Sequence, residues 1–227
     1  MGSGNTDLKW AGWLYLALAI IAPFSLSYVP SVIAEASGTL AEKVAAHQQL
    51  THLSMASEIF YQIIEVFIVL ALFKYFRNIN LNLARQMLVL GLLPLPIVFL
   101  NELNLIGAIS FATDSNMAAG LDTQLKGSMA ALFYDFHGTG IVLASIFWGL
   151  WLIPLGRLVI ISGKIPKFFG YSVMVGAAGY IISAAATLIL PSLVTPGIIE
   201  SLKFTGSLLM LGEVPIIAGL LWTAYKR

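Results

Sequence analysis

The sequence contains no cysteine, which excludes disulfide bonds and metal sites built from thiolates. Charged residues are scarce, at 10% of 227 residues, whereas soluble domains carry roughly 25%. The net charge is only +1, so the chain has no excess of positive charge with which to bind a polyanion, and we expect no nucleic-acid partner. The P-loop, the Gly-x-Ser-x-Gly motif, the dinucleotide fingerprint and the His-Glu-x-x-His motif are also missing. No enzyme class is indicated, and whether the protein is an enzyme stays open.

Apolar runs long enough to cross a bilayer recur along the whole chain. Hydrophobic residues make up 59% of the sequence, and one span needs about 20 predominantly apolar residues. The runs are continuous rather than alternating, which indicates helices. We predict an all-α membrane protein in which six transmembrane helices form a single domain over residues 1–227. The predicted spans cover residues 10–33, 54–76, 84–111, 129–161, 168–190 and 198–225.

The distribution of lysine and arginine predicts the orientation of the chain. If the N-terminus lies inside, the outer side holds only Lys43, Lys126 and Lys203. All other basic residues then lie on the inner side, as the positive-inside rule requires: Lys9, Lys74, Arg77, Arg85, Arg157, Lys164, Lys167, Lys226 and Arg227. The five tryptophans fall in the inner halves of their spans, which is typical of an interfacial belt. We predict that both termini are cytoplasmic.

Five acidic residues lie inside the predicted spans without a lysine or arginine beside them: Glu58, Glu65, Glu102, Asp135 and Glu213. An ionisable group in the hydrocarbon region is costly and is a functional-site hypothesis by default. Such acids must be protonated, must face water, or must share a bound cation. We therefore predict a functional site built on them.

The second span carries a polar stripe. At 100° per residue, its members fall within about 40° of one line: His47, Ser54, Glu58, Gln62 and Glu65. The stripe must face other helices or water, and it is either a functional cavity or a set of hydrogen bonds that joins helices. Two glutamates one heptad apart favour the cavity. Thr39 and Glu42 form a capping-box pattern, which predicts one continuous helix from Leu40 to Phe76.

Spans three and four add further polar groups. Glu102 is flanked by Asn101. Asp135 and His137 are two positions apart, about 200° around a helix, so they cannot both point the same way. Asp135 shares its face with Gly138, which lets another helix approach, so we expect Asp135 to be the inward-facing member of the pair.

Glu213 lies in the middle of span six, between Gly212 and Pro215. Proline removes a backbone donor, and a local break of this kind either builds an ion or solute site or is an ordinary kink. In span five, Tyr180 belongs to a modest polar line that would complete the wall of a cavity.

Together these groups predict a buried acidic cavity that lies nearer the outer side, between helices two, three, four and six. Its predicted residues are Glu58, Gln62, Glu65, Asn101, Glu102, Asp135 and Glu213. The cofactor is unknown; a divalent metal ion is one candidate. Its candidate ligands are His137, Glu58, Glu65, Glu102 and Asp135. Oxygen ligands suit Ca²⁺, Mg²⁺ or Mn²⁺, while an added histidine suits Zn²⁺ or iron.

Three segments resemble a known family: AGWLYLALAIIAPFSLSYVPSVI, GRLVIISGKIPKFFGYSVMVGAAGYIISAAATLILP and GEVPIIAGLLW. The most specific block joins Leu155-Gly156-Arg157-Leu158, Ser162-Gly163-Lys164-Ile165-Pro166 and Phe169-Gly170, with Phe169 where leucine is usual. The chain is similar, over nearly its whole length, to an uncharacterised, largely bacterial family of six-helix membrane proteins catalogued as domain of unknown function 4386. The resemblance implies an integral, multi-pass protein of the bacterial inner (plasma) membrane. It implies no activity.

The leading hypothesis is proton- or cation-linked binding and transport of a small solute or ion. The alternative is an intramembrane metal-dependent hydrolase that acts on a lipid or amide, and a third option is a ligand sensor or scaffold without turnover. We expect membrane lipids and a small solute or ion as partners, and a homo-oligomer stays open.

Overall fold

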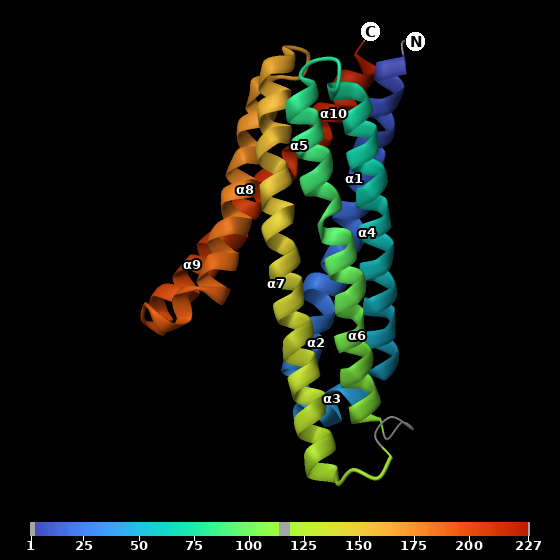
Figure 1. The fold of residues 1–227 in the computed structure, drawn as a ribbon, viewed down its shortest axis with the longest axis vertical. Coiled ribbons are helices and arrows are strands. Elements are labelled where there is room, and N and C mark those ends of the chain that lie inside the picture. Colours follow the sequence, from blue (N-terminus) through green and yellow to red (C-terminus); the bar gives the residue numbers. More distant parts are fainter. Residues whose placement is uncertain (1–2, 114–118, 227) are drawn as a thin grey trace. The chain divides into compact units, whose positions relative to one another are not determined.

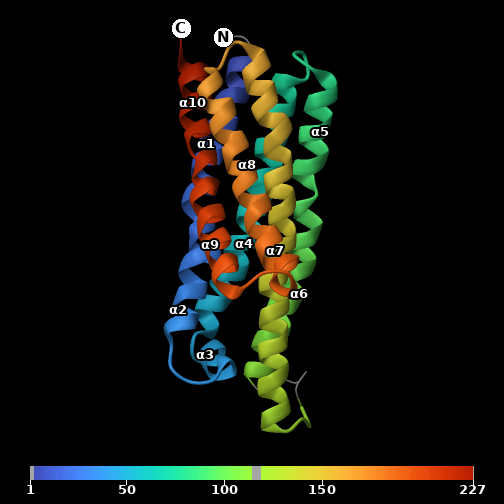
Figure 2. The same ribbon diagram turned by 90° about the vertical axis from the view of Figure 1, so that its left-hand side faces the viewer.

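The computed structural model describes residues 3–113 and 119–226, which are almost entirely helical and contain no strand (Figures 1 and 2). The elements, in chain order, are α1 (Ser3–Pro23), η1 (Phe24–Tyr28), α2 (Val29–Glu35), α3 (Leu40–Ala46), α4 (Gln48–Phe76), α5 (Leu81–Leu92), α6 (Pro94–Ala112), α7 (Thr123–Ser162), α8 (Lys167–Leu188), η3 (Leu190–Ser192), α9 (Pro196–Met210), η4 (Leu211–Glu213) and α10 (Pro215–Tyr225).

The prediction of six membrane-spanning helices is confirmed. Six helical stretches are long and apolar enough to cross a membrane: 5–35, 48–76, 81–112, 123–162, 167–188 and 196–225. The third stretch changes helix at Leu93, because Pro94 has no N–H to donate to the preceding turn. The protein is an integral, multi-pass membrane protein.

Contacts divide the chain into two compact units. Unit 1 comprises residues 1–19, 63–95 and 142–227, and unit 2 comprises residues 20–62 and 96–141.

Glycines allow α8 and α9 in unit 1 to pack backbone against backbone. A Cβ added at Gly179 would lie 2.5 Å from the Met210 nitrogen, and one added at Gly206 would lie 2.9 Å from the Gly179 oxygen. Only a residue without a side chain fits such contacts. Gly179 of span five thus serves close helix packing.

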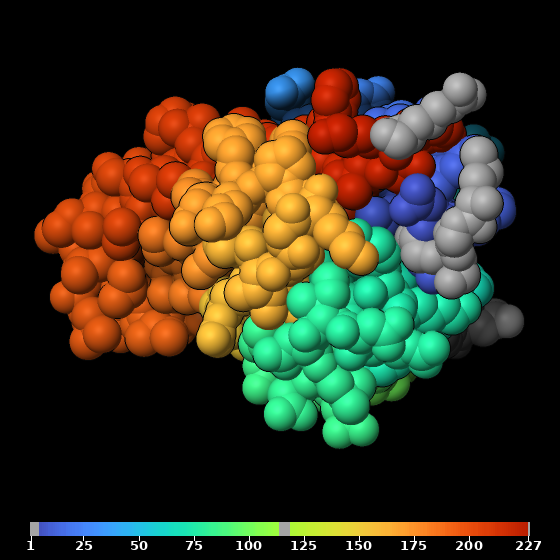
Figure 3. All heavy atoms as spheres, turned by 90° about the horizontal axis from the view of Figure 1, so that it is seen from above, coloured from blue at the N-terminus to red at the C-terminus, as the bar shows by residue number. Residues whose placement is uncertain are grey.

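The first and last helices of unit 1 meet at their ends. Trp13 Nε1 donates to the Tyr225 hydroxyl at 3.2 Å, and Lys9 Nζ lies 4.8 Å from the centre of the Tyr225 ring. The α4–α5 and α7–α8 turns lie at this same end of the unit (Figure 3). All described basic residues assigned to the inner side belong to unit 1, as does Lys203, which was assigned to the outer side, so the predicted orientation stays a prediction.

The tryptophan belt is only partly realised. Trp10, Trp13 and Trp222 are exposed, as an interfacial belt requires, but Trp148 and Trp151 are buried. The prediction is wrong for these two because they lie on the inward face of α7, where they pack against tyrosines of unit 1.

In unit 2, the capping box forms as predicted. The Thr39 amide donates to Glu42 Oε2 at 2.7 Å, and the Glu42 amide donates to Thr39 Oγ1 at 3.4 Å. The continuous helix from Leu40 to Phe76 is wrong, because the chain leaves the helical conformation at His47, where φ is −111° and ψ is 27°.

The interruption at His47 lets α3 fold back onto α2 (Figure 2). Val44 of α3 is fully buried in a core with Val29 and Ile33 of α2 and with Leu105 and Ile109 of α6. A straight helix would have carried Val44 away from this core. The segment from Leu40 to Phe76 therefore is not one rigid rod.

Candidate functional site

Two glutamates and a histidine converge inside unit 2. Glu58 comes from α4, Glu102 from α6 and His137 from α7, and one ligand atom of each lies within 4.8 Å of the other two. His137 Nε2 lies 3.3 Å from Glu58 Oε2. We refer to Glu58, Glu102 and His137 as the carboxylate–histidine cluster.

Glu58 belongs to the polar stripe predicted on the second span, and this stripe is buried. Ser54, Glu58, Gln62 and Glu65 are all at most 4% exposed, so of the two surroundings expected for the stripe, other helices or water, these four side chains face other helices. Ser54 Oγ donates to Glu58 Oε1 at 3.3 Å. The stripe ends before His47, which is partly exposed and lies between α3 and α4.

Glu102 is buried beside Glu58. It is 4% exposed, and within the described residues its two oxygens have no partner other than the Glu58 carboxyl. Glu58 Oε2 and His137 Nε2 likewise lack any partner beyond each other and Glu102. Buried polar atoms almost always have a partner. The convergence of four such atoms indicates a place where a proton or a cation binds.

Asn101 joins the two helices that carry Glu102 and His137. Its side-chain nitrogen donates to the His137 carbonyl at 2.9 Å, and its side-chain oxygen accepts from Asn104 Nδ2 at 3.0 Å. Asn101 is 5% exposed. This predicted cavity residue therefore lies beside the carboxylate–histidine cluster and fixes α7 relative to α6 within unit 2.

The expectation for the pair on α7 was wrong. The inward-facing residue is His137, and Asp135 is exposed and takes no place in the cluster. The close approach occurs at Gly140 rather than Gly138: a Cβ at Gly140 would collide with the Asn101 side chain, whereas one at Gly138 would meet nothing within 4 Å.

A sequence signal for the inward face of α7 existed. Ala130 and Ala144, each seven residues from His137, are both fully buried. Small residues seven positions before and after a histidine indicate the packed face of a transmembrane helix, and here they are a better guide than the glycine next to it.

Glu65 and Glu213 belong to unit 1, where each has partners of its own. Trp148 Nε1 donates to Glu65 Oε2 at 3.2 Å. Tyr15 donates to Glu213 Oε1, and Tyr180 donates to Glu213 Oε2 at 2.9 Å. The predicted metal-ligand set is therefore reduced to the carboxylate–histidine cluster, the group in the described part of the chain that could hold a metal ion.

The donor set of the cluster fits a divalent transition metal. Two carboxylates and one imidazole supply oxygen and nitrogen ligands, a mixture that zinc, iron and manganese accept. Two carboxylates this close repel each other when both are ionised, so the site favours binding of either a proton or a cation.

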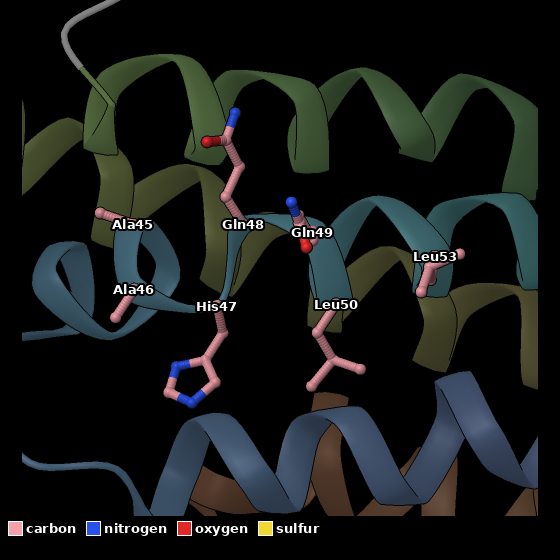
Figure 4. Close-up of a pocket in the computed structure, with 7 residues that line it drawn as sticks. All are labelled: Ala45, Ala46, His47, Gln48, Gln49, Leu50 and Leu53. Atoms are coloured by element: carbon pink, nitrogen blue, oxygen red, sulfur yellow. The ribbon is translucent and has the colours of Figure 1, made fainter.

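A separate hollow lies at the junction of α3 and α4 (Figure 4). It has a volume of about 530 Å³, and its lining runs through Ala45, Ala46, His47, Gln48, Gln49, Leu50 and Leu53. His47 and Leu50 point to one side of the chain and Gln48 to the other. None of the three residues of the carboxylate–histidine cluster lines this hollow.

Comparison with known proteins identifies the family. The family model described as "Domain of unknown function (DUF4386)" matches residues 10–224. The chain belongs to this family. No curated protein and no solved structure matches it. The description of DUF4386 names no activity, so the function must be argued from the carboxylate–histidine cluster itself.

Proposed function

We propose that this DUF4386 protein is a proton- and cation-linked membrane transporter in which the carboxylate–histidine cluster exchanges a proton for a divalent transition-metal ion. The observation that carries the proposal is the convergence of buried carboxylate oxygens and an imidazole nitrogen whose nearest polar partners are one another. Without a cation, a proton between Glu58 and Glu102 reduces their repulsion. When a cation binds, that proton leaves, because metal ligands must be deprotonated.

The location of the cluster supports linkage to transport. Acids within membrane spans commonly mark ion pathways and proton relays. Glu58, Glu102 and His137 come from three different helices, so movement of any one helix would change the ligand set. With both termini in the cytoplasm of a bacterial inner membrane, as the basic residues and the family resemblance favour, the chain would exchange ions between the cytoplasm and the exterior.

Binding is tested first on the purified full-length protein. Titration calorimetry with Zn²⁺ or Mn²⁺, in two buffers of different ionisation enthalpy, measures both affinity and protons released. We expect stoichiometric binding with proton release in the wild type and its loss in Glu58→Gln and Glu102→Gln. Asp135→Asn is the matched control, because Asp135 is an exposed acid in the same unit.

Transport is then tested in proteoliposomes with the same ions and an opposing pH gradient. We expect ion uptake that depends on the gradient and disappears in the Glu58→Gln, Glu102→Gln double variant. Flux unchanged in that variant overturns the proposal. Binding without flux would instead support the sensor or scaffold function.

The donor set also favours a second candidate, a metal-dependent hydrolase. Two carboxylates and a histidine are three protein ligands, and catalytic zinc sites typically have three protein ligands and one position for water. A metal ion held there would lower the pKa of bound water and so supply a nucleophile. Incubation of metal-loaded protein with phospholipids and lipid amides tests this function, and loss of hydrolysis in Glu102→Gln but not Asp135→Asn would support it.

A further inference from the structure

Glu213 lies where the last span is interrupted. The short turn η4 (Leu211–Glu213) separates α9 from α10. Pro215 has no N–H to donate to the Leu211 carbonyl, which accepts from the Val214 amide at 3.1 Å instead. The carboxyl group is thus carried by a helix break inside a membrane span, a local structure that in transporters often adjoins an ion site.

Two tyrosines from different helices bind this carboxyl. Tyr15 of α1 donates to Oε1, and Tyr180 of α8 donates to Oε2 at 2.9 Å. Tyr15 is 3% exposed, and Glu213 is partly exposed. Both donors are neutral, so they stabilise a carboxylate without cancelling its charge.

The titratable neighbours of Glu213 are Tyr15 from α1 and Tyr180 from α8. Glu65 from α4 interacts with Tyr15. Helix α7 contributes Trp148, which packs against Tyr180, and Trp151, which packs against Tyr15; neither titrates. No lysine, arginine or histidine is among these described groups.

The backbone of the break is fixed against α8. A Cβ at Gly176 would lie 2.9 Å from the Glu213 nitrogen, and one at Gly212 would lie 2.5 Å from the Ser172 oxygen. Because both contacts reach the backbone, η4 cannot slide closer to α8. A change of charge on Glu213 therefore alters its hydrogen bonds and does not move η4 closer to α8.

We propose that Glu213 is a second proton-binding site, separate from the carboxylate–histidine cluster, and that its protonation weakens the hydrogen bonds that hold the break between α9 and α10 to two tyrosines. A proton from water binds one carboxylate oxygen. The ionised group accepts from both tyrosines. The protonated oxygen becomes a donor, so the tyrosine on that oxygen must accept from it instead of donating to it. The break is held by two charge-assisted hydrogen bonds when Glu213 is ionised and by two weaker, neutral ones when it is protonated.

The test combines infrared difference spectroscopy with amide hydrogen exchange over residues 206–217, on the full-length protein as a function of pH. In the wild type we expect a carboxylic acid band to appear on acidification. Amide exchange at 211–217, corrected for its intrinsic pH dependence, should accelerate roughly two- to tenfold in the same pH range, the factor expected when charge-assisted hydrogen bonds become neutral ones.

Both changes should vanish in Glu213→Gln and persist in Glu200→Gln, a matched control because Glu200 is an exposed acid on α9. In the Tyr15→Phe, Tyr180→Phe double variant, the Glu213 band should still titrate while exchange no longer responds. If Glu213→Gln fails to fold, the Glu213 band and the amide exchange of this double variant test the proposal.

A pH-dependent step in exchange that survives in either Glu213→Gln or the double variant overturns the proposal, as does the absence of a Glu213 band at every pH where the protein is folded. Metal binding at the carboxylate–histidine cluster, measured by calorimetry, should be the same in Glu213→Gln and the wild type. The outcome is therefore independent of the proposed transport function.

Discussion

The imidazole Nε2 of His137 lies 3.3 Å from Glu58 Oε2, inside two helices that are apolar over most of their length. Both side chains are largely buried, at 12% and 1% exposure. An acid within a membrane span usually pairs with another polar group or faces water. The partner of Glu58 is His137. It lies two positions from Asp135, the acid that was expected from the sequence to face inward.

Replacement of Glu102 by glutamine should abolish metal binding. Glu102 contributes two buried oxygens to the cluster, and the amide supplies a weaker ligand of similar shape. The affinity for Zn²⁺ or Mn²⁺ should fall by more than the roughly 10–100-fold that changes around a metal site cause. Glu65→Gln and Asp135→Asn should retain the wild-type affinity, since neither residue joins the cluster. Equal losses in all three variants would argue against a local site.

Replacement of Asn101 by alanine should weaken metal binding without removing a ligand. Asn101 holds the backbone of His137, and loss of an orienting hydrogen bond typically costs about 10–100-fold in metal affinity. Asn82→Ala is the control, because Asn82 is exposed at the start of α5 in unit 1. An unchanged dissociation constant for the metal in Asn101→Ala would show that Asn101 does not support the metal site.

Alanine substitutions at two neighbouring glycines of α7 should have opposite outcomes. Gly140→Ala places a methyl group on the Asn101 side chain, and overpacking of this kind costs about 1–3 kcal/mol. Gly138→Ala enters open space and should leave stability unchanged or raise it by up to about 1 kcal/mol, through helix propensity. Thermal unfolding in detergent compares the two variants. A lower Tm for Gly138→Ala than for Gly140→Ala would contradict the packing of α6 on α7.

The capping box of α3 should respond to acid. The hydrogen bonds from Thr39 lower the pKa of the Glu42 carboxyl below its ordinary value. The stabilisation of α3 is therefore fully present above the ordinary pKa and is lost as the pH falls through the lowered folded value. Amide exchange over residues 40–46 should accelerate in that acidic range. Glu42→Gln, which keeps an acceptor at every pH, should show no such step, and Glu42→Ala should show rapid exchange throughout.

Composition and local pattern were sufficient for the secondary structure and the class of protein. Long apolar runs predict helices because lipid satisfies no backbone hydrogen bond, and this constraint acts on each segment separately. The capping box at Thr39 and the break before Pro215 are equally local, since they depend on atoms a few residues apart. The burial of the stripe from Ser54 to Glu65 followed from helical periodicity alone.

Tertiary structure decided which polar residues meet. The choice of His137 over Asp135 depends on how α7 is rotated against α6, and that rotation is set by the contact between Gly140 and Asn101, 39 positions apart in the chain. The fold also brings Tyr15 to Glu213 from the opposite end of the sequence. The sequence by itself determined that buried acids exist within six membrane helices. Which partner each acid has was decided by side-chain packing between helices, because helical periodicity defines the face of one helix and carries no information about the helix that covers it.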